Sequence, residues 1–300
     1  MYLSGFADEA SATWEGQIKA TKALGWKYIE TRKLFDGNLA SITDAQFEQV
    51  RKDLEENGLK FNAYGSAIAN WSHPINKEAE SSYEEMQKAI PRMQKMGLKY
   101  VRIMSFNVPD ELKPKSWDFA DEVVKRVTKI VKMAEDAGLV CLHENCMNWG
   151  GLSFEHTLYL LDKIQSPAFR LVFDTGNPAF NLDCRGEAPY TKQQDVWEFY
   201  TNVREFVDHI HIKDGYYPEG SNDFKFTFAG EGNGYVKEIL KDLCERGYDG
   251  GITIEPHVAT VFHDADDQNS SDLKEQRKME TYIAYGKALQ QLVADAGFKI

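Results

Sequence analysis

Four side chains of the kinds that bind metal ions stand at the ends of four predicted strands. They are Glu144 in LVCLHEN, Asp174 in RLVFDTGN, His211 in HIHIKD and Glu255 in ITIEPH. The intervals between them are 30, 37 and 44 residues, each the length of one strand and helix. Three carboxylates and one imidazole suit a divalent ion such as Mn²⁺, Mg²⁺, Co²⁺ or Zn²⁺. Without a cation, carboxylates held close together would raise one another's pKa.

A single inward carboxylate has a second explanation, which is an ion pair inside the protein. Four such residues on consecutive strand ends favour the metal site. Strand alternation supports this interpretation, because Ile210 and Ile212 face one side of an extended HIHIKD segment while His209, His211 and Lys213 face the other. The same alternation places the ligands of the sixth and eighth strands inward.

The other polar residues beside the predicted ligands receive different interpretations. His209 lies about 6.6 Å from His211 along the strand and is expected to be a hydrogen-bonded core histidine. Lys213 is expected at the lip of the pocket, where it either holds a substrate oxygen or phosphate or neutralises the acidic cluster. If Glu144 points inward, His143 points toward the helices and needs a hydrogen-bond partner there.

The elements that position these residues follow an alternating pattern. The predicted strands are Tyr2–Ala7, Tyr28–Thr31, Lys60–Gly65, Tyr100–Ser105, Val140–Asn145, Arg170–Asp174, His209–Lys213 and Gly251–Glu255. The predicted helices are Ala12–Leu24, Asp44–Glu56, Tyr83–Met96, Ser116–Ala137, Phe154–Ile164, Asp195–Phe206, Tyr235–Arg246 and Asp272–Ala296. Glycines that follow helices are expected to be left-handed C′ residues: Gly25, Gly58, Gly97, Gly138 and Gly247.

Eight strand and helix units without a linker predict an α/β protein with one closed (β/α)8 TIM barrel, a single domain over residues 1–300. The alternative is a doubly wound sheet with a cap. Longer loops are expected at Asn107–Lys115, Gly176–Gln194, Gly215–Asn233 and Pro256–Ser271. Three of these loops follow late strands, and barrels place their chemistry in the loops at the C-terminal ends of strands.

Composition limits the classes of partner. The chain is 42% hydrophobic and 27% charged, and its net charge of −12 disfavours binding to nucleic acid. It has no basic leader followed by an apolar stretch and no apolar run of about 18 residues, so a cytoplasmic protein without a membrane partner is expected. Four cysteines without C-x-x-C spacing are expected to be reduced thiols. The sequence leaves the oligomeric state open, and a homo-oligomer is compatible with it.

The chain resembles the xylose-isomerase-like superfamily of sugar-phosphate isomerases, ketose 3-epimerases, inosose-processing enzymes and DNA-repair endonucleases. The motifs that carry this resemblance are HEN, FDTGNP, HIHIKD, GEG at residues 230–232, and ITIEP. The resemblance implies that Glu144, Asp174, His211 and Glu255 bind one divalent metal ion. It also implies that Glu144 and Glu255 act as acid and base.

Some positions depart from the ketose epimerases. Asn177 stands where those enzymes usually carry a histidine, and Gly150 and Tyr217 stand at the positions of their substrate-binding Glu and Arg. Their substrate contacts therefore do not transfer to this chain. The DNA-repair branch uses a histidine-rich site with several metal ions, and this chain lacks the second histidine after FDT, which disfavours a nuclease.

The predicted activity is isomerisation or epimerisation of a keto-sugar or sugar derivative in carbohydrate metabolism, an activity of enzyme class 5. The metal would stabilise an enolate while the two glutamates move the proton. The predicted substrate contacts are Asn177, Lys213, Trp149 and Glu231. An inosose-type dehydratase or a keto-glycoside lyase could use the same site. A non-catalytic barrel with a structural metal ion is the alternative from another class. The sequence does not choose between phosphorylated and unphosphorylated sugars.

Overall fold

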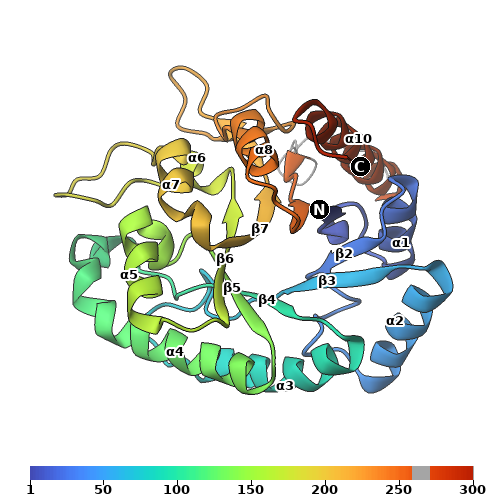
Figure 1. Ribbon diagram of the computed structural model, residues 1–300, viewed down its shortest axis with the longest axis horizontal. Helices are drawn as coiled ribbons and strands as arrows, with labels where there is room; N and C mark the ends of the chain where they lie inside the picture. The colour runs from blue at the N-terminus through green and yellow to red at the C-terminus, as the bar shows by residue number, and fades with distance from the viewer. Residues whose placement is uncertain (259–270, 300) are drawn as a thin grey trace. The chain divides into compact units, whose positions relative to one another are not determined.

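A computed structural model describes residues 1–258 and 271–299. Strands and helices alternate throughout these ranges (Figure 1). The predicted strands correspond to β1 (Tyr2–Gly5), β2 (Tyr28–Thr31), β3 (Lys60–Gly65), β4 (Tyr100–Ile103), β5 (Val140–Glu144), β6 (Phe169–Asp174), β7 (Val207–Ile212) and β10 (Gly251–Ile254). Every predicted strand is confirmed, and the ends differ from the prediction by at most two residues.

The predicted helices are also present. They are α1 (Trp14–Ala23), α2 (Asp44–Asn57), α3 (Glu80–Met96), α4 (Ala120–Asp136), α5 (Phe154–Ile164), α7 (Val196–Val203), α8 (Val236–Glu245) and α10 (Ser271–Asp295). α4 begins later than predicted, because residues 110–119 form a 3₁₀ segment that contains Pro114 and a non-helical residue at Lys115.

Local sequence signals explain where the helices begin and end. Thr43 begins α2 with a capping box, in which Thr43 Oγ1 accepts from the backbone N–H of Gln46 and Gln46 Oε1 accepts from the backbone N–H of Thr43. The five predicted C′ glycines have φ values between 65° and 73°, which confirms their left-handed conformation. Shorter elements complete the connections: α6 (Asn177–Phe180) and a hairpin of β8 (Asp214–Tyr216) and β9 (Lys225–Thr227).

The chain forms two compact units, and each is described by itself. Unit 1 comprises residues 1–62 and 210–300, and unit 2 comprises residues 63–209. The prediction of one domain over the whole chain stays a prediction. Of the predicted loops, residues 259–270 of Pro256–Ser271 lie outside the described residues.

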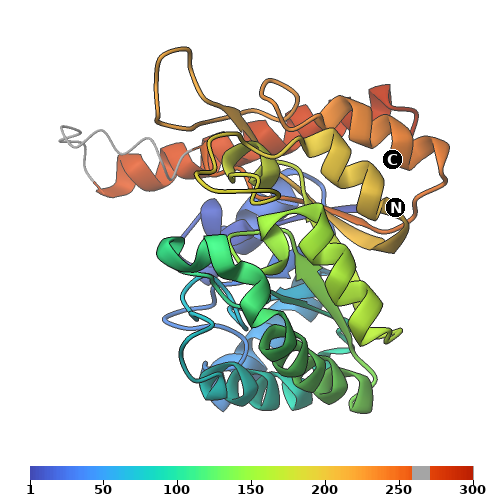
Figure 2. The ribbon, with the colours of Figure 1, turned by 90° about the vertical axis from the view of Figure 1, so that its left-hand side faces the viewer.

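In unit 2, the parallel strands follow the order β3, β4, β5, β6. Helices α3, α4 and α5 lie along one side of these strands (Figures 1 and 2). The α4 face toward the strands is apolar, with Val123, Val127, Ile130 and Val131 almost completely buried. This packing places the C-terminal ends of β5 and β6 beside each other.

In unit 1, β1 pairs in parallel with β10, and Gly5 lies opposite Ile254. Strand β10 is also next to β7. The C-terminal ends of β7 and β10 therefore lie side by side. No helix in the described part of the chain is long and apolar enough to cross a membrane.

Candidate metal centre and active site

Unit 2 presents two predicted ligands on neighbouring parallel strands. Glu144 is the last residue of β5 and Asp174 is the last residue of β6. In the register of the two strands, Glu144 lies opposite Val172. Both carboxylates are buried, with exposures of 1% and 0%. Because burying an uncompensated carboxylate is costly, each requires hydrogen bonds or cations around it.

Backbone groups hold the carboxylate of Asp174. The N–H groups of Gly176 and Asn177 donate to Asp174 Oδ1 over 2.9 and 2.7 Å. Asn145 binds the backbone of the same residue twice: its Nδ2 donates to the Asp174 carbonyl over 3.0 Å, and its Oδ1 accepts from the Asp174 N–H over 2.7 Å. Asn145 thus fixes the end of β6 to the segment after β5. The predicted substrate contact Asn177 is buried beside the proposed ligand.

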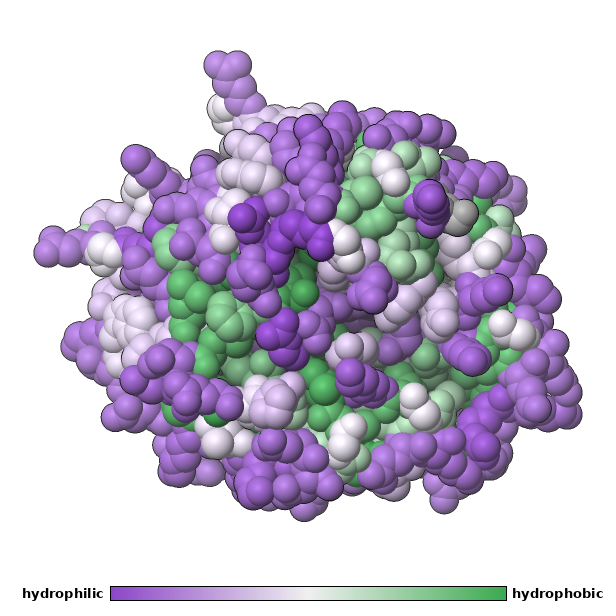
Figure 3. Space-filling view, viewed as in Figure 1, coloured by the Kyte–Doolittle hydropathy of each residue, from purple (hydrophilic) through white to green (hydrophobic). Residues whose placement is uncertain are grey.

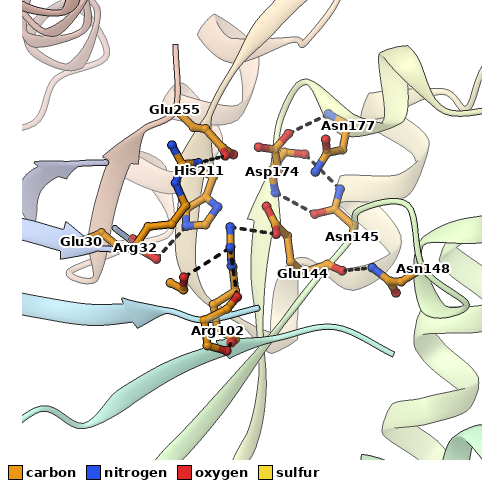
Figure 4. A network of polar contacts seen from close by, with 12 residues as sticks. Glu30, Arg32, Arg102, Glu144, Asn145, Asn148, Asp174, Asn177, His211 and Glu255 are labelled. Atoms are coloured by element: carbon orange, nitrogen blue, oxygen red, sulfur yellow. Dashed lines mark hydrogen bonds and ion pairs between the residues drawn. The ribbon is translucent and has the colours of Figure 1, made fainter. Parts of the chain in front are cut away.

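Two side chains contact Glu144: Arg102 contacts its carboxylate, and Asn148 contacts its backbone carbonyl (Figure 4). Arg102 Nη1 lies 3.3 Å from Glu144 Oε2, and the arginine side chain is itself buried. Asn148 Nδ2 donates to the Glu144 carbonyl over 3.0 Å. Sequence reasoning missed Arg102, although the alternation of YVRI places it on the opposite side of the strand from Val101 and Ile103.

The partner that His143 was predicted to need is Ser105. The Ser105 hydroxyl donates to Asn148 Oδ1 over 2.5 Å, so it accepts from His143 Nε2, 3.0 Å away, and from the backbone N–H of Gly150, 2.7 Å away. Burial lowers the pKa of His143 to about 4. His143 is therefore a neutral structural histidine behind Glu144.

Unit 1 presents the other two predicted ligands. His211 lies in β7, and Glu255 directly follows β10, where its backbone N–H donates to the Ile212 carbonyl over 3.0 Å. His211 Nε2 lies 3.1 Å from Glu30 Oε1, and both side chains are buried. The His211 ring also meets Phe6 edge to face, with centroids 5.0 Å apart. Glu30 was not singled out from the sequence.

Two cations contact the carboxylate of Glu255. Arg32 Nη1 lies 2.8 Å from Oε1, and Lys213 Nζ lies 3.1 Å from Oε2. Burial would raise the pKa of Glu255, but the charges of Lys213, His257 and Arg32 outweigh burial and hold this pKa well below its usual range. Glu255 is therefore ionised near neutral pH. Of the two roles that the sequence left open for Lys213, the contact with Glu255 favours neutralisation of the acidic cluster.

Arg32 belongs to a wider ion-pair network in unit 1. It lies 2.9 Å from Asp8 Oδ2 and 3.2 Å from Glu9 Oε1, and His257 Nδ1 lies 3.0 Å from the same Glu9 oxygen. Glu9, Glu255 and His257 each offer a ligand atom, and these atoms lie within 4.8 Å of one another, a spacing that could hold a metal ion. The guanidinium of Arg32 already supplies positive charge to this trio.

The structure places the remaining predicted contacts in different environments. Trp149 is completely buried, and its indole N–H donates to the Ser116 carbonyl over 2.8 Å. It packs against Trp117 and His156, so its predicted contact with substrate stays a prediction. Glu231 is exposed. His209 is buried, as expected of a core histidine.

Asp214 is the residue that organises the GEGNG turn around Glu231. Its Oδ2 accepts from the backbone N–H groups of Gly230 and Gly232 over 2.8 and 3.0 Å. Its Oδ1 accepts from those of Gly215 and Gly234 over 2.9 and 2.8 Å. Burial raises the pKa of Asp214, whereas these four hydrogen bonds favour its ionised form. Asp214 is the last residue of the HIHIKD motif, and an acidic residue at that position was the feature of the sequence that could have indicated its hydrogen bonds to the turn.

The chemistry of the donor set fits a divalent ion. Each unit supplies a buried pair of ligand-forming side chains at the C-terminal ends of neighbouring parallel strands, and carboxylate oxygen with imidazole nitrogen is a common combination at Mn²⁺ and Zn²⁺ sites. Each of these four residues also makes a hydrogen bond or ion pair to a neighbouring residue, and such contacts are what orients metal ligands in proteins. The described residues thus contain two such pairs, one in each unit.

Comparisons with known proteins agree with the alternation of strands and helices. The profile of a family described as xylose isomerase-like TIM barrel matches residues 18–279. A curated relative, fructoselysine 3-epimerase of Escherichia coli O157:H7, is 31% identical over 68 residues, which are 23% of each chain. The match thus spans about a quarter of the length of that relative.

Solved structures share the fold over the whole chain. The IOLI protein, crystallised with a bound zinc atom, has a TM-score of 0.71 and 15% identity and is matched over 100% of both chains. A xylose isomerase-like protein from Mycobacterium smegmatis, in complex with magnesium, has a TM-score of 0.65 and 16% identity, with 93% of this chain and 89% of that chain covered. The predicted (β/α)8 fold is confirmed, and the chain belongs to the xylose isomerase-like TIM barrel family.

Proposed function

We propose that this chain is a metal-dependent isomerase or epimerase of a keto-sugar or sugar derivative. Glu144, Asp174, His211 and Glu255 would together hold one divalent ion. The observation that carries the proposal is the pair of buried ligands in each unit, placed at the C-terminal ends of neighbouring strands. In TIM-barrel enzymes these strand ends carry the catalytic residues, so we infer that the two pairs complete one centre.

The relatives support the choice of reaction and cofactor. The curated relative is named fructoselysine 3-epimerase, and solved structures of the same fold include a D-allulose 3-epimerase in complex with D-allulose. Solved structures of the same fold hold magnesium or zinc. A bound divalent cation would polarise a substrate carbonyl and increase the acidity of the neighbouring C–H group.

The two glutamates would carry the proton in this mechanism. One carboxylate removes the proton from the carbon beside the carbonyl, and the other returns a proton from the opposite face, which inverts that carbon. Return of the proton to the neighbouring carbon would instead exchange a ketose and an aldose. Arg102 on Glu144, and Arg32 with Lys213 on Glu255, would orient the two carboxylates.

Incorporation of deuterium from solvent into a panel of ketoses, with Mn²⁺ supplied, tests the proposal. We expect exchange in the wild-type protein and its loss in Glu144→Gln and Glu255→Gln. Glu238→Gln is the matched control, because Glu238 is an exposed glutamate on α8. Full exchange in both active-site variants would contradict the two-carboxylate mechanism. A product lighter by one water, or a cleaved product, would instead identify a dehydratase or a lyase.

A further inference from the structure

A pocket of about 590 Å³ lies within unit 2, among the loops that include those directly following the proposed ligands Glu144 and Asp174. Its lining comes from the loops that follow β3, β4, β5 and β6. These loops supply Trp71, Lys113, Met147, Phe180 and Leu182, among other residues. Pockets of roughly 300–1,000 Å³ receive ligands of drug-like size. The unit 2 pocket therefore has room for more than a single small polar group.

Several large and exposed apolar side chains gather around this pocket, together with polar ones. Figure 3 shows a face of the molecule that is largely hydrophilic, with patches of apolar side chains. Trp71, Met147, Phe180 and Leu182 are among the most exposed large apolar side chains of the described residues, at 54%, 45%, 37% and 37%. Their gathering around one pocket is typical of a binding site.

The pocket is continuous with the residues that hold the proposed ligands. Asn148 lines the pocket, and its side chain donates to the Glu144 carbonyl over 3.0 Å. Phe180 lines it as the last residue of α6, whose first residue, Asn177, donates its backbone N–H to Asp174 over 2.7 Å. A molecule whose reacting carbon lay near the two carboxylates could extend directly into this pocket.

The charges of the pocket disfavour a phosphate group. Of the residues that line it in the described chain, Lys113 is the one with a cationic side chain. Its ammonium group lies 2.6 Å from Asp110 Oδ1, and Asp110 also lines the pocket. A phosphate would meet a cation that is already paired and a neighbouring carboxylate, whereas a neutral ring would meet aromatic and thioether surfaces.

We propose that the unit 2 pocket binds an aromatic group attached to the sugar, so that the substrate is an unphosphorylated keto-sugar that carries an aryl group. This inference rests on the proposed function, because it takes the sugar to lie at the ligands of that site. The apolar surface of the pocket then stabilises the complex by removing both partners from water.

Isothermal titration of the Mn²⁺-loaded protein with matched probes tests the inference. Phenyl β-D-glucopyranoside is expected to bind about tenfold more tightly than methyl β-D-glucopyranoside, a difference typical of a buried aromatic contact. Trp71→Ala and Leu182→Ser are expected to remove this advantage and leave the affinity for the methyl glucoside unchanged. Leu273→Ala is the matched control, because the exposure of Leu273, 48%, lies between those of Trp71 and Leu182 and Leu273 belongs to α10 in the other unit.

Equal affinity for the two glucosides would overturn the inference. So would absence of binding by both, or an aryl preference that survives in Trp71→Ala. Tighter binding of glucose 6-phosphate that is lost in Lys113→Ala would assign the pocket to a phosphate instead. Deuterium exchange separates the two proposals. Exchange that is equally fast with plain and aryl-bearing ketoses removes the pocket inference alone, whereas aryl-dependent binding without exchange removes the proposed reaction alone.

Discussion

The ammonium group of Lys213 lies 3.1 Å from Oε2 of Glu255, and both side chains are buried. Lys213 therefore supplies, within unit 1, part of the positive charge that a metal ion would supply to the same carboxylate. Arg32 contacts the other carboxylate oxygen. The two cations explain how Glu255 stays ionised although it is buried. Because they compete with a metal ion for the carboxylate, substitution of one of them should change the affinity of Glu255 for the metal ion.

We expect Lys213→Met to destabilise the metal-free protein and to strengthen Mn²⁺ binding. Loss of one partner of a buried ion pair typically costs about 3–5 kcal/mol, and Arg32 should reduce this cost to about 1–3 kcal/mol. Chemical denaturation measures the stability, and titration calorimetry measures the affinity for Mn²⁺. Lys213→Arg, which keeps the charge, is the control. Weaker Mn²⁺ binding in Lys213→Met would contradict this explanation.

Substitution of the proposed ligands should separate two candidate metal sites. Asp174→Asn and His211→Gln are expected to lower Mn²⁺ affinity by at least about tenfold, since even residues that only orient ligands are worth about 10–100-fold. Glu9→Gln and His257→Asn should leave the affinity within about threefold, because these residues belong only to the trio with Glu255. Metal analysis after dialysis provides the measurement. The reverse pattern would place the ion at the Glu9 trio.

Removal of the Asp214 carboxylate should release the GEGNG turn. Asp214→Ala leaves four buried or partly buried backbone N–H groups without their acceptor, and each unsatisfied donor costs about 1–3 kcal/mol unless water reaches it. We expect loss of several kcal/mol in stability and faster hydrogen exchange at Gly230, Gly232 and Gly234. Glu231→Gln, on the exposed side chain within the same turn, should change neither. Unchanged exchange at these glycines in Asp214→Ala would show that the carboxylate does not hold the turn.

Acid should destabilise the protein partly through His156. Its ring nitrogens lie 2.8 Å from Ser153 Oγ and 3.2 Å from Ser116 Oγ, and the ring stacks on Trp117. Burial lowers the pKa of His156 to about 4. The unfolded chain, with a pKa of about 6.5, binds the proton first as the pH falls. The contribution of neutral, buried His156 to the free energy of unfolding is therefore complete above pH 6.5. It is lost between pH 6.5 and 4, and the total loss is about 3 kcal/mol.

Urea unfolding at several pH values measures this effect. His156→Gln should flatten the decline of the unfolding free energy between pH 6.5 and 4. The decline should not vanish, because burial also lowers the pKa of His143 to about 4. An identical slope in the variant and the wild-type protein would show that His156 does not contribute.

The strands and helices were predictable because their signals are local. Alternating apolar residues, Thr43 at a helix start and glycines such as Gly58 act within a few positions of the chain. The α4 start was predicted too early because residues 110–119 form a 3₁₀ segment, interrupted at Lys115, that no apolar periodicity reveals. The burial of Trp149 depends on Trp117 and Ser116, which precede it by more than thirty residues.

The candidate site was predictable in part for the same reason. Its four proposed ligands stand out because each ends a strand, and strand alternation assigns their side. The residues that hold them are joined over long distances in sequence, as with Arg32 and Glu255, which are 223 residues apart. Such pairs become visible only when the neighbouring strands are known, although the inward positions of Glu30 and Arg102 could have been found by the same alternation.

Asn145 binds both the N–H and the carbonyl of Asp174, so the residue after one proposed ligand fixes the backbone of the next. The positions of Glu144 and Asp174 thus depend on the hydrogen bonds that Asn145 and Asn148 make with the main chain, and no such bond comes from Trp71, Met147 or Leu182 among the described residues. In evolutionary terms, the loop residues Trp71, Met147 and Leu182 are free to change while the two proposed ligands, Glu144 and Asp174, keep their positions. One inherited arrangement of proposed ligands could in this way accommodate a succession of different ligands in the unit 2 pocket.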